Sequence, residues 1–369
     1  MFIIPVFVKA EDVLLAPKAK SVLVMEPSTG SIIYERNSHE KLHPASMTKM
    51  MTMLLIIESV EKGIINLDDM VTVSSNASSM GGSQILLETG EKMSVNDLLK
   101  GIAVASGNDA AVAMAEKIGG TEEAFVAMMN ERAKELGLND TNFKNVHGLD
   151  DVNHYSSAYD MAMIAKELVK HPKILEFTSI YEDYLRKGTD RAFWLVNTNK
   201  LVRFYDGVDG LKTGYTSEAG HCLTATANID GMRIIAVVMG EPDSNTRSSE
   251  VSSIFDYVYA QYALDKVVTK DTDLGEYDVD KGKVNKIKVA PIEDVTILHK
   301  KAEKMDNVTY DIEVDKLIAP INIGNLIGNL TLKQNGVVIK SVPLTVSENV
   351  SKANIFEVFW KNLKDTLSI

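Results

Sequence analysis

The chain has 369 residues, 45% of them hydrophobic and 24% charged, with a net charge of −12. This length allows two domains with a large core, and the composition is ordinary for a globular protein. The acidic balance argues against a general nucleic-acid binder, because phosphate binding requires a basic surface. Cys222 is the one cysteine, so no internal disulfide forms. A lone cysteine fits either a reducing compartment or an exported protein that uses no disulfides.

The N-terminal stretch MFIIPVFVKA is apolar and ends in Val8-Lys9-Ala10, whose first and last residues match a signal-peptidase site. We interpret residues 1–10 as the remnant of a signal peptide, with a first β-strand or a disordered tag as the alternative. This interpretation predicts an exported protein. Further along the chain, no run of about 20 apolar residues indicates a membrane-spanning helix.

A β-hairpin is predicted over residues 19–37, where two apolar runs flank the turn EPSTG. A helix follows from about Ser46 to Lys62 and is stopped by Gly63. Ser46 stands at the start of this helix, with Lys49 one turn further in. By itself this arrangement is typical of an N-cap serine and a surface lysine. The alternative is a nucleophile and its base.

The region from about 90 to 175 is predicted to be mostly helical. Helices are expected over residues 93–105, 106–120 and 121–137. Ser94 and Asp97 are placed as a capping box, and Asp109 and Thr121 are the expected caps of the next two helices. Asp160, further on, is expected to cap or brace the helix that follows it.

From about residue 208 the pattern changes to three successive strands, over 207–216, 220–229 and 231–241, and then a helix over about 245–264. The last two strands meet at Asp230-Gly231, a strong hairpin turn. We expect the N-terminal hairpin and these strands to share one antiparallel sheet. The helical insertion between them would form a second lobe.

After Lys266 the pattern becomes short and β-like, which predicts a separate small β domain over residues 267–350. Residues 351–369 predict an amphipathic helix with an apolar face. That face consists of Ile355, Phe356, Phe359, Trp360, Leu363 and Leu367. The helix would either dock on the β domain or lie at a membrane surface, with its lysines toward anionic headgroups. We favour the membrane.

Three short motifs occur in order along the chain: Ser46-x-x-Lys49, Ser106-Gly107-Asn108 and Lys212-Thr213-Gly214. Each is weak alone, but together they resemble the signature of class A β-lactamases and penicillin-binding proteins. The closer resemblance is to the low-molecular-mass penicillin-binding proteins that are serine D-alanyl-D-alanine carboxypeptidases. The stretches SVLVMEPSTGSIIYERN, FKNVHGLD and VDGLKTGYTSEAGHCLTATA carry it. It spans about residues 20 to 265.

This resemblance implies an α/β (α+β) fold of the β-lactamase/transpeptidase type, an antiparallel sheet with a helical lobe, followed by a small all-β domain. The catalytic domain would span residues 11–266. The implied activity removes the terminal D-alanine from peptidoglycan stem peptides that end in D-Ala-D-Ala, through an acyl-enzyme on Ser46, and so regulates cross-linking. β-Lactam antibiotics would be covalent inhibitors, and no metal or cofactor is implied. The implied location is the outer face of the cytoplasmic membrane, the cell wall or the periplasm.

The chemistry of the first motif has its own physical logic. A serine hydroxyl is a weak nucleophile and needs a base within hydrogen-bond reach. Positions 46 and 49 lie on one face of a helix, so Lys49 can reach Ser46. Burial and a second cation, Lys212, would lower the pKa of Lys49 so that its amine accepts a proton. The proton passes either directly to Lys49 or by way of Ser106, and both routes stay open.

The resemblance implies roles for the remaining motif residues. Ser106 would relay a proton to the leaving D-alanine, and Asn108 would hold Lys49 and the substrate amide. Lys212 would supply positive potential. Thr213 would bind the terminal carboxylate of the substrate. Gly214 would let the peptide lie alongside the strand as an added strand.

Two further positions match the same family. The backbone N–H groups of Ser46 and Tyr215 would form the oxyanion hole. Arg247 matches a carboxylate-binding arginine, unless it is simply an exposed arginine at the start of a helix. His147 is expected to fix a loop rather than act as a base, and Cys222 to fill a buried apolar position.

Several rival functions are consistent with the same motifs. The loop over residues 147–160 has no Glu-x-x-x-Asn pattern for a deacylating water, so we expect a penicillin target rather than a β-lactamase. A DD-endopeptidase on the same fold is a second rival. A non-enzymatic protein that binds the cell wall is a third, and the complete set of motif residues argues against it.

Overall fold

The computed structural model describes residues 13–303, 305–354 and 357. The chain divides into two compact units between Ala260 and Gln261. The predicted signal-peptide remnant, residues 1–10, lies outside the described residues. So does most of the predicted tail helix. The first residues of that helix, 351–353, are not helical, because Lys352 pairs with Gly282 and the Ala353 N–H donates to the Lys281 carbonyl.

The first unit is built on a five-stranded sheet in the order β2-β1-β9-β8-β7, antiparallel throughout. Its strands are β1 (Ser21–Glu26), β2 (Ser31–Arg36), β7 (Val208–Thr216), β8 (Gly220–Ile229) and β9 (Met232–Glu241). The prediction that the N-terminal hairpin joins the later strands is therefore confirmed. Asp230 and Gly231 both have positive φ, 52° and 82°, as a tight hairpin turn requires.

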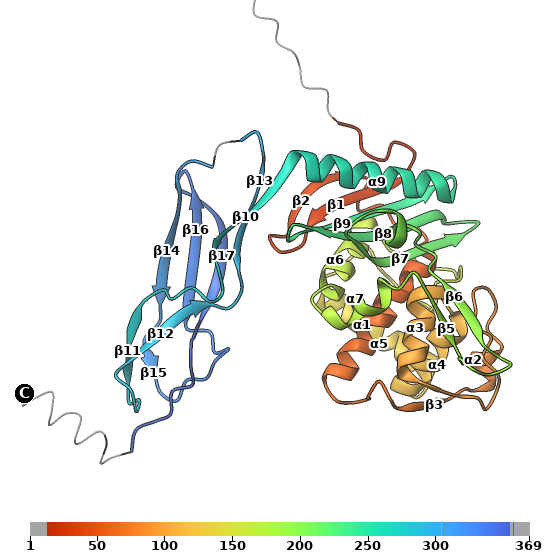
Figure 1. Ribbon diagram of the computed structural model, residues 1–369, viewed down its shortest axis with the longest axis horizontal. Coiled ribbons are helices and arrows are strands. Elements are labelled where there is room, and N and C mark those ends of the chain that lie inside the picture. The colour runs from red at the N-terminus through yellow and green to blue at the C-terminus, as the bar shows by residue number, and fades with distance from the viewer. Residues whose placement is uncertain (1–12, 304, 355–356, 358–369) are drawn as a thin grey trace, which may run out of the picture. The chain divides into compact units, whose positions relative to one another are not determined.

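One long helix, α9 (Ser244–Gln261), lies along one face of this sheet, and the helical lobe lies on the other (Figure 1). The prediction that this helix continues to about residue 264 is wrong. Residues Tyr262–Val268 form the strand β10, which pairs with β13 (Val295–Lys300). A strand partner distant in sequence thus decides where the helix ends.

Within the described residues, the helical lobe consists of one 3₁₀ helix, eight α-helices and two small two-stranded sheets. These elements are η1 (Ala45–Thr48), α1 (Lys49–Glu61), α2 (Ser75–Ser78), α3 (Val95–Ala105), α4 (Asn108–Gly119), α5 (Glu122–Glu135), α6 (Ala158–Leu168), α7 (Pro172–Thr178), α8 (Leu201–Phe204), β3 (Met70–Thr72) with β4 (Lys92–Ser94), and β5 (Glu182–Leu185) with β6 (Phe193–Val196). Helix α1 is buried on all sides from Lys49 to Ser59. A helix that is enclosed in this way holds the residues at its first turn in a fixed position.

The predicted helix caps are partly confirmed. Ser94 accepts a hydrogen bond from the N–H of Asp97, and Thr121 caps α5 by accepting from Ala124. The prediction that Asp109 caps α4 is wrong. Gly107 is the N-cap residue, and the Asp109 carboxylate instead accepts N–H groups of a loop that packs against α4.

Asp160 also has a different partner from the one expected. Ser157 caps α6, whereas the Asp160 carboxylate accepts from the Asp140 N–H and the Thr141 hydroxyl. It therefore braces the segment before the helix, because that segment folds back against the first turn of α6.

Apart from the last residue of α9 and the single helical residue Glu357, the regular elements in the described residues of the second unit are β-strands. Its main sheet has the order β14-β16-β17-β12-β11-β15. The strands are β11 (Glu276–Asp280), β12 (Lys286–Pro291), β14 (Val308–Val314), β15 (Leu317–Ile318), β16 (Gly328–Gln334) and β17 (Val337–Val346). Aliphatic side chains such as Leu330 and Leu344 form its core. In the described part of the chain, no helix has the length and apolar character needed to cross a membrane.

Candidate active site

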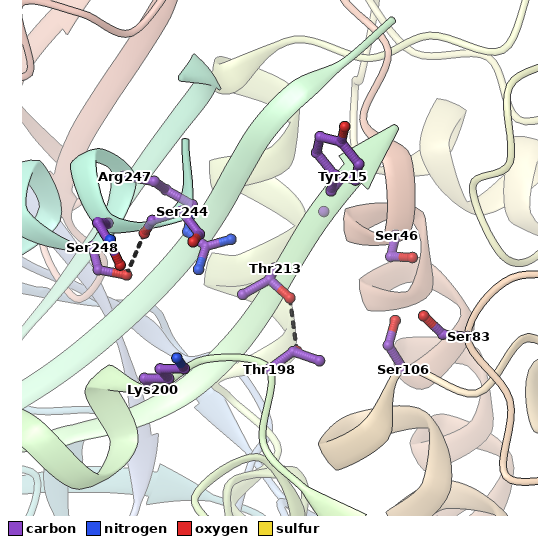
Figure 2. A pocket seen from close by; sticks show the side chains of 12 residues that line it. Ser46, Ser83, Ser106, Thr198, Lys200, Thr213, Tyr215, Ser244, Arg247 and Ser248 are labelled. Carbon is purple, nitrogen blue, oxygen red and sulfur yellow. Dashed lines mark hydrogen bonds between the residues drawn. The ribbon is translucent and has the colours of Figure 1, made fainter. Parts of the chain in front are cut away.

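A cavity of about 330 Å³ opens between strand β7 and the helical lobe (Figure 2). Its lining contains six of the nine residues predicted from the motifs. The full lining is Ser46, Ser83, Ser106, Thr198, Lys200, Thr213, Gly214, Tyr215, Ser244, Asn245, Arg247 and Ser248. The other three predicted residues, Lys49, Asn108 and Lys212, are buried polar groups. Hydrogen bonds connect each of them to a lining residue or its neighbour.

Ser46 lies in the 3₁₀ turn η1, directly before α1. The side chain does not cap the helix, since the N-cap residue of η1 is Pro44 and no side-chain cap bond forms. The Ser46 hydroxyl instead lies 3.1 Å from the Lys49 side-chain nitrogen. The preceding residue, Ala45, has a φ of 47°, a left-handed conformation that is strained for a residue with a side chain. The turn therefore presents Ser46 at some conformational cost.

Two glycines pack against this turn. A Cβ on Gly148 (φ +88°) would meet the Ala45 carbonyl oxygen at 1.8 Å, and a Cβ on Gly214 would meet the Pro44 carbonyl oxygen at 2.7 Å. Both positions therefore need glycine for close backbone approach. Gly148 was not identified from the sequence. For Gly214, the close packing of β7 on the serine turn is a reason beyond the one that the motif suggested.

Lys49 is fully buried and has three oxygen neighbours. Its Nζ lies 2.6 Å from Asn108 Oδ1 and 2.7 Å from the His147 carbonyl oxygen, besides the contact with Ser46. Burial first, and then repulsion from Lys212, lower the pKa of Lys49 well below its ordinary value. In its neutral form this amine would donate its two hydrogens to the amide and carbonyl oxygens. Its lone pair would then be free to accept the proton of Ser46.

Ser106 ends helix α3 in a left-handed conformation with a φ of 63°. Its hydroxyl is buried and, among the described residues, has no hydrogen-bond partner. Such a group is costly unless a partner arrives. Figure 2 shows the side chains of Ser46, Ser83 and Ser106 gathered on the helical-lobe side of the cavity, across from β7. A bound molecule in this cavity could therefore supply the missing partner.

Cationic side chains gather on the opposite side of the cavity. Lys212 is 1% exposed and Arg247 is 6% exposed, so the interpretation of Arg247 as an exposed helix-start arginine is wrong. Burial, together with repulsion from Arg247, lowers the pKa of Lys212 to about 7. The Arg247 Nε has no partner among the described residues. Neither side chain forms a salt bridge with a carboxylate of the described residues, and buried cations of this kind are suited to binding a carboxylate.

Thr213 and Tyr215 line the cavity from strand β7, which also carries Lys212. The Thr213 hydroxyl donates to Thr198 Oγ1 at 2.7 Å. The Tyr215 ring is 59% exposed and stacks on His221 with 4.3 Å between the ring centroids. The side chain of Tyr215 thus stands at the mouth of the cavity, while its backbone belongs to β7.

His147 and Cys222 have the structural surroundings expected of supporting residues. Burial lowers the pKa of His147 to about 3, so the ring is neutral, and its Nδ1 accepts the Leu149 N–H. Burial raises the pKa of Cys222 to about 11, so it remains an unreactive thiol. Neither side chain lines the cavity.

Half of the cavity lining was missed from the sequence: Ser83, Thr198, Lys200, Ser244, Asn245 and Ser248. These residues come from three segments that carry no recognisable motif. For Thr198 and Lys200 the one available signal is their position shortly before β7, the strand that carries Lys212. Ser83 gives no local signal, because the loop that carries it reaches the cavity only through tertiary packing.

Comparisons with known proteins cover both units. Residues 8–243 match the family described as D-alanyl-D-alanine carboxypeptidase. Residues 262–352 match the penicillin-binding protein 5, C-terminal domain. The chain is 50% identical to the D-alanyl-D-alanine carboxypeptidase DacF of Bacillus subtilis, over 95% of this chain and 90% of that protein. It is 33% identical to DacC of Escherichia coli, over 96% of this chain and 90% of that protein.

Solved structures give the same picture. Penicillin-binding protein 5 from Haemophilus influenzae superposes with a TM-score of 0.75 at 33% identity, over 93% of this chain and 100% of that one. PBP3 from Streptococcus pneumoniae, a peptidoglycan synthesis regulatory factor, has a TM-score of 0.74 at 27% identity, over 92% of this chain and 100% of that one. These likenesses extend over both units and confirm the predicted fold class.

Proposed function

The chain belongs to the D-alanyl-D-alanine carboxypeptidase family, and from that premise we propose that Ser46 is the nucleophile of an acyl-enzyme mechanism. The chain is a serine-type D-Ala-D-Ala carboxypeptidase, a hydrolase of peptidoglycan metabolism in the penicillin-binding family. One observation carries the proposal for Ser46. Its hydroxyl lies 3.1 Å from the amine of Lys49, which is buried and has a lowered pKa.

In the acylation step, Ser46 Oγ attacks the carbonyl carbon of the penultimate D-alanine. The hydroxyl proton passes to the Lys49 amine, directly or through Ser106. The backbone N–H groups of Ser46 and Tyr215 stabilise the oxyanion. When the C–N bond breaks, Ser106 relays a proton to the departing D-alanine nitrogen. A water molecule then hydrolyses the ester and restores the Ser46 hydroxyl.

The cationic side of the cavity accounts for the requirement for a free C-terminus. Arg247, Lys212 and Thr213 would bind the terminal carboxylate of the stem peptide, and Asn108 would hold the substrate amide as well as Lys49. The burial of both cations and the unpartnered Arg247 Nε support this role. A carboxylate bound there favours a carboxypeptidase over an endopeptidase, whose substrate continues past this point.

β-Lactams would enter the same cavity and acylate Ser46. We expect the adduct to be long-lived, because the loop that follows His147 lacks the glutamate pattern that activates a deacylating water. Removal of the terminal D-alanine also removes a group that a cross-linking reaction needs. The protein would therefore regulate cell-wall cross-linking.

The place of action follows from the substrate. Peptidoglycan stem peptides lie outside the cytoplasm, so we infer an exported protein at the outer face of the membrane, the cell wall or the periplasm. The catalytic domain would span residues 11–266, the β domain 267–350, and residues 351–369 would attach the protein to the membrane surface. The apolar face predicted for that last segment supports the attachment.

The test is Ser46→Ala, with Ser59→Ala as the matched control. Ser59 is a buried serine on the same helix, and its hydroxyl donates to the Leu55 carbonyl. We expect Ser46→Ala to abolish both D-alanine release and covalent labelling by penicillin, while Ser59→Ala retains both. D-alanine release or labelling that survives in Ser46→Ala would contradict the assignment of the nucleophile.

A further inference from the structure

A loop over residues 81–87, here called the 81–87 loop, lies across the motif Ser106-Gly107-Asn108. Two of its carbonyl groups hold Asn108. Gly81 O accepts from Asn108 Nδ2 at 2.7 Å, and Ser83 O accepts from the Asn108 N–H at 2.7 Å. The side chain of Ser83 lines the cavity (Figure 2). The position of this loop therefore determines the position of two groups at the site.

Asp109 holds the same loop from inside the lobe. Its carboxylate is 1% exposed and accepts the N–H of Ile85 at 3.1 Å and the N–H of Leu87 at 3.0 Å. It also accepts the N–H of Ala110 at 2.8 Å. Hydrogen bonds from backbone N–H groups to a charged carboxylate are strong, and a buried carboxylate that loses them is costly. Asp109 is thus a rigid anchor for the loop.

Arg186 holds the loop from the other side. It donates to the carbonyl groups of Ile85 at 3.1 Å and Leu86 at 3.3 Å, and its Nε pairs with Glu91 at 2.6 Å. Leu86 has a φ of 56°, a left-handed conformation that a leucine adopts only when its surroundings impose it. The inner and outer anchors together supply that constraint.

We propose that Asp109 is a positioning residue of this enzyme: its carboxylate fixes the 81–87 loop and thereby holds Ser83 and Asn108 in register with Ser46. The inference rests on the proposed roles of Ser46 and Lys49. It adds a residue that touches neither substrate nor nucleophile. Asn108 and Asp109 are the first two residues of α4. The start of this helix therefore contributes one residue to the site and the next to the loop.

The charge of Asp109 has a second consequence, at Lys49. Three ionisable groups face Lys49 from the elements packed against it: Lys212 on β7, Asp109 on α4 and His147 on the loop between α5 and α6. Lys212 lowers the pKa of Lys49 and Asp109 raises it, while His147 is neutral because its own pKa is lowered to about 3. Removing the Asp109 charge therefore lowers the pKa of Lys49 further. The acid limb of kcat/KM then moves to lower pH, because the active amine is neutral.

The first experiment measures D-alanine release against pH in Asp109→Asn, with Asp97→Asn as control. Asp97 is a partly exposed aspartate on the neighbouring helix, paired with Lys100. We expect kcat/KM of Asp109→Asn to fall about tenfold to a hundredfold, since small displacements of positioned groups cost rates of this size. We also expect its acid limb to move to lower pH, and Asp97→Asn to match the unmodified protein. An unchanged kcat/KM or an unmoved acid limb in Asp109→Asn overturns the proposal.

The second experiment does not depend on activity or on a variant that folds. Amide hydrogen exchange at Ile85 and Leu87 in the unmodified full chain should be slow, because both N–H groups donate to a buried carboxylate. Rapid exchange at both overturns the proposal.

A third experiment measures the activity of Arg186→Gln. This change should lower kcat/KM without moving the acid limb, since Arg186 holds the loop but does not face Lys49. A moved limb contradicts the proposed division of roles. If instead Ser46 is not the nucleophile, the exchange result still stands, so the two failures are distinguishable.

Discussion

In the unit that ends at Ala260, three cationic side chains are buried beside one cavity, whereas in the described residues of the unit that follows no cationic side chain is buried and several pair with carboxylates. Lys49, Lys212 and Arg247 are buried. In the second unit, Lys288 pairs with Asp273 at 2.7 Å, and both side chains are about half exposed. Apart from Thr296, no polar or charged side chain is buried among the described residues of that unit.

Burying a cation without a counter-charge is costly. Such buried cations occur mainly where the group takes part in binding or catalysis, so strongly shifted pKa values mark functional sites. We therefore infer that the first unit carries out the reaction and that the second unit has a structural role. Substitutions in the two units should differ in kind: those in the first change the rate, and those in the second change only stability.

The largest effect is expected from Lys49→Met, which nearly keeps the length of the side chain and removes the proposed base. The kcat/KM for D-alanine release should fall roughly 10²- to 10⁴-fold, the usual contribution of a positioned base. The control is Lys62→Met, at the other end of the same helix, where the side chain is 64% exposed. Equal kcat/KM values in the two variants would contradict the proposal that Lys49 is the base.

A smaller effect, on substrate binding, is expected from Arg247→Gln. A hydrogen bond to a charged group contributes about 1.5–3 kcal/mol, which corresponds to about a tenfold to hundredfold change in affinity. We expect KM for a peptide ending in D-Ala-D-Ala to rise by this factor with kcat less affected. The same peptide with an amidated C-terminus is the control, since it should bind both proteins equally poorly. A KM that does not change for the free acid contradicts the role of Arg247 as carboxylate ligand.

For Lys212→Met we predict a shift in the pH dependence of kcat/KM in addition to any loss of activity. Repulsion from Lys212 contributes to the lowered pKa of Lys49, so Lys212→Met should let that pKa rise. Since the proposed base is the neutral amine of Lys49, its active form would then appear at higher pH, and the acid limb of the residual kcat/KM should move upward. This is the opposite direction from Asp109→Asn. An acid limb that stays in place in Lys212→Met would mean that the two lysines do not interact.

The second unit supplies the contrast in stability. Leu330 is fully buried in its core, and Leu330→Ala should destabilise that unit by about 2–5 kcal/mol, the usual cost of such a cavity. Thermal unfolding would measure this loss. We expect kcat/KM at a temperature where both units are folded to stay unchanged. A loss of activity in the folded variant would show that the second unit contributes to the reaction.

The smallest effect is expected from Lys288→Met, which breaks an exposed ion pair in the second unit. Such pairs contribute little, because water screens both charges. Neither the unfolding midpoint nor D-alanine release should change measurably. A clear change in either would contradict the view that charges in this unit are only surface charges.

Much of the fold could be predicted from local patterns. The hairpin around EPSTG, the turn at Asp230-Gly231 and the cap at Ser94 are decided by residues close in sequence. What failed depends on partners distant in sequence. The end of α9 is decided by pairing of β10 with β13. Asp109 has the local pattern of a cap, but its carboxylate is bound by a loop more than twenty residues earlier.

The site shows the same division. Ser46, Ser106 and Lys212 each stand in a short motif, and the structure brings them to one region. Ser83 has no motif, and the unpartnered hydroxyl of Ser106 or the close approach of Gly148 to Ala45 appears only in three dimensions. Sequence patterns indicate which residue types are present, whereas burial and packing decide which of them change their chemistry.

The most direct test of Ser46 activated by buried Lys49 is mass spectrometry of the full chain after brief penicillin treatment, with peptide mapping of the adduct. The predicted result is a single adduct on the peptide that contains Ser46. It should last for minutes or longer, and form far more slowly in Lys49→Met than in Lys62→Met. An adduct on another peptide, or equal rates of adduct formation in those two variants, would contradict it.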